Sequence, residues 1–186
     1  MAAGCSTGDL SSDMAGLRTE IEQLQRDIPP EAPLWISEGE NAFPKFLDDH
    51  SPRVPDFVYN HIVTKLVKGS AASFDSQAAG DFAYDACMGD PSAFRGKFWR
   101  VRMTIGVLRA QQVNPETGAT DVHTGLGWIN RLPVVFHCVE KPEVLRLHDD
   151  IIEFTGLFLK IHRFTAKDGS VVDAPLFLAK VVRKYY

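Results

Sequence analysis

RGKFWRVRMTIGVLR, residues 95–109, is a long apolar-rich segment with a glycine inside it. Its apolar side chains alternate with polar or small ones as far as Gly106, and this period of two is typical of a strand with one buried face. A second segment, Asp150–Phe164 (DIIEFTGLFLKIHRF), repeats the pattern up to Gly156. A glycine inside such a run usually marks a bulge or bend. Two long, bent strands are what a small closed barrel requires.

Shorter apolar runs around these two segments predict the remaining strands. Turn signals stand at 114–119 (NPETGA) and 167–169 (KDG), and residues 141–148 read as a short helical or irregular link. Five strands are therefore expected, and their predicted bounds are Lys97–Ala110, Asp121–Ile129, Val134–Glu140, Ile151–Phe164 and Val171–Arg183.

This strand order resembles that of an oligonucleotide/oligosaccharide-binding (OB) barrel, a five-stranded, partly open Greek-key barrel. Arg95-Gly96-Lys97 leading into VRMTIG, and LHDDIIEFTG followed by LFLK, resemble the first and fourth strands of the tRNA-anticodon-binding-like OB family. Asp149 departs from that pattern, since the family commonly has glycine there. The segment ending in APLFLAKVV also resembles poorly characterised bacterial proteins with a helical segment before such a barrel. The resemblance implies a fold and brings no catalytic residues with it.

The first 90 residues are predicted to contain three further parts. Residues 29–54 hold five prolines and read as an extended connector. Residues 55–90 read as a helical hairpin with helices over Pro55–Lys68 and Phe74–Met88. The expected class is α+β, with the OB-like β-barrel over 91–186. Residues 1–28 are predicted to form a helical, coiled-coil-like arm, whose narrow apolar seam would consist of Leu10, Met14, Leu17, Ile21, Leu24 and Ile28.

The arm is expected to bind protein, because a helix this short is not stable alone in water. A protein partner, a second copy of the chain and the arm's own domain could each cover the seam. A narrow seam suits a helix-to-helix contact better than the cover of a sheet, so we expect a protein partner or a homo-oligomer.

The three cysteines leave two questions open. Ala2-Ala3-Gly4-Cys5 resembles the end of a lipoprotein signal without its charged start and apolar stretch. A lipid anchor at Cys5, with a periplasmic or membrane-anchored location, thus stands beside a cytoplasmic one. A disulfide between Cys87 and Cys138 is the second open question. No run of residues approaches the length of a membrane-spanning helix.

Known catalytic motifs are missing from the sequence. It contains no Walker A, GxGxxG, HExxH or GxSxG pattern, and its six histidines are scattered. His148-Asp149-Asp150 is the one tight group, and a polar turn is the expected reading of it, in preference to a metal site. We therefore expect no enzyme, no catalytic residue, no metal and no cofactor.

Two functions from different classes remain. Residues 1–94 carry 6 basic and 15 acidic side chains, whereas residues 95–186 carry 14 and 9, a modest excess for a nucleic-acid-binding half. We expect a non-enzymatic accessory or structural subunit that uses the arm and the barrel for protein contacts. The alternative is a single-stranded nucleic-acid-binding OB module, because basic and aromatic residues interleave in the strands. Its candidate ligand face consists of Phe98, Arg100, Arg102, Lys160 and Arg163.

Overall fold

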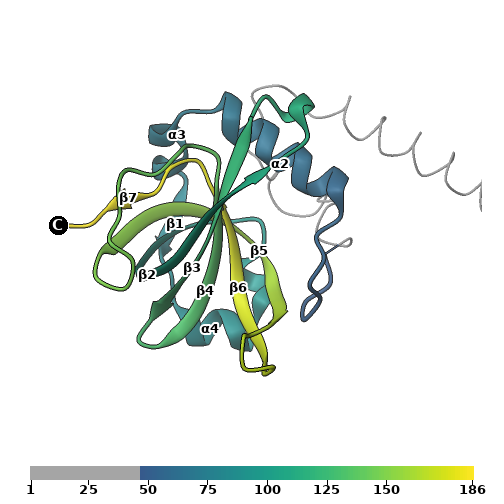
Figure 1. The fold of residues 1–186 in the computed structure, drawn as a ribbon. Helices are drawn as coiled ribbons and strands as arrows, with labels where there is room; N and C mark the ends of the chain where they lie inside the picture. Colours follow the sequence, from purple (N-terminus) through teal and green to yellow (C-terminus); the bar gives the residue numbers. More distant parts are fainter. Residues whose placement is uncertain (1–46) are drawn as a thin grey trace, which may run out of the picture. The chain divides into compact units, whose positions relative to one another are not determined.

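The computed structural model describes residues 47–186, in which a mixed sheet of seven strands is accompanied by a few short helices (Figure 1). The predicted arm over Leu10–Ile28, the question of a lipid anchor at Cys5 and most of the proline-rich connector lie outside these residues. Within 47–186, no helix is long and apolar enough to cross a membrane.

The helix predicted over Pro55–Lys68 is confirmed as α2 (Asp56–Lys68). Gly69 is the C-cap of this helix, and its N–H donates a hydrogen bond of 2.9 Å to the carbonyl of Lys65. The last free carbonyls of the helix, those of Leu66 and Val67, each accept a hydrogen bond from Lys180 Nζ at 3.1 Å. A cation suits the negative end of the helix dipole, so Lys180 ties the end of α2 to the sheet.

The prediction of a second helix over Phe74–Met88 in the hairpin is wrong. A short strand interrupts this segment and pairs in parallel with the start of the next strand. Gly80 has a φ of +153° inside this strand, a conformation unsuited to a helix. Backbone pairing therefore outweighs the helix propensity of the alanines. The observed elements are α3 (Ala71–Ser76), β1 (Ala78–Asp81), α4 (Tyr84–Gly89) and α5 (Pro91–Phe94).

The five predicted strands are present with ends shifted by a few residues, except that the last one is split in two. The sheet order is β1-β2-β3-β4-β6-β5-β7, and β2 also pairs with β5. The pairings of β2, β3, β4, β6 and β5 therefore form a closed cycle, in which only β4 and β6 run parallel. The bounds are β2 (Phe98–Gln112), β3 (Asp121–Ile129), β4 (Leu132–Cys138), β5 (Ile151–Thr165), β6 (Val171–Ala179) and β7 (Arg183–Lys184), with a 3₁₀ turn η2 (Pro115–Thr117) after β2.

The bends predicted at the two strand glycines have different outcomes. In β2 the register shifts around Gly106, as expected for a bulge. In β5 the shift falls around Leu159, between Phe158 and Lys160, three residues beyond the predicted position. Gly156 instead marks the point where β5 pairs with β2 on one side and β6 on the other. A Cβ there would lie 2.9 Å from the ring of Phe154, so close packing explains the glycine.

Most side chains of the core belong to the strands of this cycle, and the short helices α4 and α5 add Cys87 and Phe94. The strand residues include Val101, Ile105, Phe136, Phe158 and Phe177, all buried. The two described cysteines, Cys87 and Cys138, are free thiols in the same core, and burial raises the pKa of each to about 12. The disulfide left open by the sequence is therefore not formed in this structure.

The connector residues that the structure describes cover one edge of β5. The pairing of β5 with β2 ends at Leu157, so on that edge of β5 the backbone N–H and carbonyl of Ile161 have no strand partner. The Asp49 carboxylate accepts the N–H of Ile161 at 2.7 Å, and the N–H of His50 donates to its carbonyl at 2.9 Å. Arg95 forms an ion pair with Asp49 and holds this arrangement. An otherwise exposed edge is thus closed against pairing with other chains.

Candidate binding groove

Three of the five residues of the predicted ligand face lie together on β2. Arg100 and Arg102 share the outer face of the strand, where they pair with Asp81 and Glu153 respectively. Phe98, two residues earlier, is buried, and its ring stacks on that of Phe74 from α3 at a centroid distance of 5.2 Å. Helix α3 therefore covers this aromatic ring, so the ring is not accessible to a ligand.

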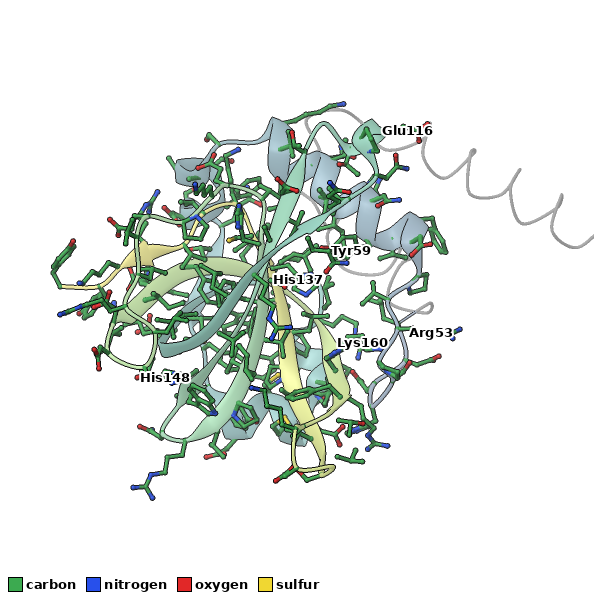
Figure 2. All side chains as sticks on the ribbon, viewed as in Figure 1. Arg53, Tyr59, Glu116, His137, His148 and Lys160 are labelled. Carbon is green, nitrogen blue, oxygen red and sulfur yellow. The ribbon has the colours of Figure 1, made fainter. Side chains whose placement is uncertain are left out.

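The structure places the other two predicted residues away from the first three. Lys160 is fully buried, and its Nζ donates to the carbonyl of Arg53 at 2.8 Å (Figure 2). Burial lowers the pKa of this lysine. Arg163 binds the carboxylate of Asp173 with two hydrogen bonds of 2.8 Å. Both cations are thus occupied by groups of their own chain.

A groove of ≈ 450 Å³ lies elsewhere, between the outer face of β2–β4 and the end of β5. Val107, Leu126 and Val135 provide its apolar floor, and His162 and Phe164 its aromatic wall. Their chain neighbours Phe136 and Ile161 point into the core, so the alternation of strand side chains turns the groove residues outward. The two aromatic rings are stacked, with centroids 6.1 Å apart and planes inclined by 22°.

Glycines on the inner face of β3 set the position of the floor. A Cβ on Gly125 would lie 2.2 Å from the ring of Phe136, which fills that space. The strand therefore lies close against the core, and the outward residues Thr124 and Leu126 on either side of Gly125 line the groove.

The charge of the groove is cationic. Arg109 lines it, and its exposed guanidinium has no carboxylate partner among residues 47–186. No Asp or Glu side chain lines the groove. In the wall, Nδ1 of His162 is buried without a hydrogen-bond partner in the described part of the chain, and burial, followed by the charge of Lys160, lowers the pKa of this ring. The groove thus suits an apolar occupant that carries a negative charge.

Helix α2 covers the neighbouring part of the same outer face. The hydroxyl of Tyr59 shares a hydrogen bond of 2.8 Å with Nδ1 of His137, which lies two residues beyond Val135 on β4 (Figure 2). Burial lowers the pKa of His137 to about 4 and raises that of Tyr59. The pair is therefore neutral at neutral pH and anchors α2 against the sheet.

The polar turn predicted at His148-Asp149-Asp150 is present. The carboxylate of Asp150 accepts the N–H of Arg146 at 2.8 Å and pairs with Lys184 at 2.8 Å, and these contacts lower its pKa to about 2. The ring of His148 stacks on Trp128. Across the described residues, no group of three His, Cys, Asp or Glu side chains could hold a metal ion.

Comparisons with known proteins found only solved structures of low similarity. No family model and no curated protein matches the chain. Among solved structures, a chain described as an aspartyl-tRNA synthetase from Leishmania major Friedlin is 7% identical with a TM-score of 0.36, over 61% of this chain and 24% of that chain. The aspartyl tRNA synthetase from Entamoeba histolytica is 8% identical with a TM-score of 0.39, over 84% of this chain and 27% of that one. The chain spans about a quarter of the length of each, and these similarities assign no family to it.

Proposed function

We propose that this chain is a non-enzymatic accessory or structural protein, built on an OB-like β-barrel, that binds a protein partner. The closed cycle of five strand pairings supports the barrel, since the parallel pair β4–β6 and the pair β2–β5 are what close such a sheet. The outer surface of the barrel then provides the contacts.

The groove over β2–β4 is the observation that carries this proposal. Its apolar floor fits the side chains of an extended or helical protein segment, and Arg109 fits an acidic residue beside them. Residues 47–186 carry 17 basic and 16 acidic side chains, so this part of the chain has a net charge of only +1. Binding to a phosphate backbone normally relies on many more uncompensated cations.

A second candidate function is the binding of single-stranded nucleic acid in the same groove. The stacked rings of His162 and Phe164 favour it, because nucleobases stack on such rings and Arg109 could contact a phosphate. This candidate ranks second because the groove contains a single unpaired cation.

The helical arm over Leu10–Ile28 belongs to the same proposal as a further contact element. It lies outside the described residues, so its apolar seam is the only support for this part. An arm that packs helix to helix would join the partner through a surface separate from the groove.

Site-specific photocrosslinking in the source cells tests the proposal. A photoreactive amino acid at Thr124, inside the groove, should give one protein adduct of defined mass that protease removes and nuclease does not. Leu126→Asp, which puts a charge on the apolar floor next to this position, should abolish the adduct. The same photoreactive residue at Val144, which is 97% exposed in the link before β5, serves as the control. An adduct removed by nuclease would favour the second candidate, and identical adducts at both positions would refute a specific groove.

A further inference from the structure

A second charged surface lies on the outer face of three adjacent strands. Cross-strand register places Arg102 of β2 opposite Glu153 of β5, and Glu153 opposite Arg183 of β7. Arg100 stands opposite Thr155, two residues along the same strands. Directly paired residues share a face of a sheet, so Arg102 and Arg183 flank Glu153, and Arg100 lies diagonally across from it.

Two of these arginines line a pocket of ≈ 180 Å³ under helix α3. Arg100 and Arg183 belong to its lining, and the nearly buried Thr155 lies between their strands. Lys180 also lines the pocket, but its ammonium group is bound to the end of α2 and to Glu140 at 3.1 Å. The two guanidinium groups are therefore the cations with donors left for a ligand.

The guanidinium groups of these two arginines make few hydrogen bonds within the described part of the chain. Arg100 reaches Asp81 through one nitrogen at 3.5 Å, and Arg183 reaches Asp75 through one nitrogen at 3.4 Å. By contrast, Arg163 holds its carboxylate with two bonds of 2.8 Å. A guanidinium has five N–H donors, so most of those of Arg100 and Arg183 have no acceptor in the described part of the chain.

We propose that this pocket binds a phosphoryl group, either as free phosphate or as a phosphate monoester. Two guanidinium forks on opposite sides of β5 can each donate two hydrogen bonds to one tetrahedral group, and the hydroxyl of Thr155 supplies a further donor. Two carboxylates also line the pocket, those of Glu153 and Asp75. Glu153 is paired with Arg102 and Asp75 with Arg183, so each negative charge is offset by a neighbouring guanidinium. The site is separate from the groove over β2–β4, and its existence does not depend on the function of that groove.

Titration of the full chain with inorganic phosphate and with phosphoserine at low ionic strength tests the site. The side-chain Nε–Hε NMR signals of Arg100 and Arg183 are expected to shift with a saturable curve. Arg100→Gln should weaken binding about tenfold or more, because it removes a charged fork. Arg100→Lys keeps the charge and should also weaken binding, whereas Arg131→Gln, in the β3–β4 turn, should leave it unchanged.

Saturable binding of either ligand with these variant effects supports the site, and the tighter ligand identifies free phosphate or a monoester as the source. Failure of both ligands to saturate would overturn the proposal. So would equal affinities of Arg100→Gln and the unchanged chain, with the fold of the variant checked by its amide spectrum. Loss of partner crosslinking at Thr124 would leave this result untouched, so the two proposals fail separately.

Discussion

Gly127→Ala is expected to lower the free energy of unfolding by about 2–4 kcal/mol, although it adds a single methyl group. A Cβ at this position would lie 2.4 Å from the carbonyl oxygen of Thr104 and 3.0 Å from Cε of Met103. The methionine can move, but the carbonyl belongs to the β2–β3 ladder, where Gly127 pairs with Ile105. Relief of the clash therefore requires the two strands to separate, and urea denaturation measures the cost.

Gly89→Ala is the matched control for this substitution. Gly89 ends α4, and no atom lies within 4 Å of the position of its Cβ. Its denaturation midpoint should stay close to that of the unchanged chain. If both variants unfold at the same urea concentration, the close contact of β3 with β2 is not present in solution.

The buried His137 should make the fold sensitive to acid. Burial, followed by the charge of His162, lowers its pKa from 6.5 to about 4. Between these two values the unfolded chain binds a proton that the folded chain does not, so stability falls as the pH falls. The loss attributable to this ring is about 3 kcal/mol between pH 6.5 and 4. The pKa values of His61 and His162 are also lowered, and they add losses of the same sign.

His137→Gln should flatten this part of the stability profile by about 3 kcal/mol, because glutamine does not titrate. Tyr59→Phe is the control, since it removes the 2.8 Å hydrogen bond and leaves the imidazole buried. It should lower stability at every pH and keep the acid-induced loss. Urea denaturation at pH 7, 6, 5 and 4 provides the comparison. An unchanged slope in His137→Gln would mean that the ring is hydrated in solution.

The strands were predictable because their signal is local. Alternation in β2 and β5 and the turn residues between strands located all five predicted segments. The split of the last one into β6 and β7 was not visible, because an apolar run does not show where its partner strand ends. β1 was missed for a related reason. Its four residues, Ala78–Asp81, carry no strand pattern and are extended because the edge of β2 provides backbone partners.

The candidate sites show the limit of arguing from residue type alone. Alternation correctly placed Arg100 and Arg102 on one face. The burial of Phe98 under Phe74 was not predictable, because this contact joins residues far apart in the sequence and no local pattern indicates it. Lys160 reads as a surface cation in the sequence and is buried, since the chain near Arg53 crosses over it. A signal for the groove did exist. Leu126 stands between two glycines, and an apolar residue on the outward face of a predicted strand indicates a contact surface.

Native mass spectrometry of the protein isolated from its source tests the proposed function most directly. The proposal predicts a complex heavier than a single chain, whose mass falls when Leu126→Asp disrupts the groove or Leu17→Asp disrupts the seam of the arm. Val171→Asp, at a 65% exposed position of the β5–β6 hairpin, should keep the mass of the complex. The proposed function would be contradicted if the unchanged protein is a single chain, or if neither Leu126→Asp nor Leu17→Asp lowers the mass of the complex.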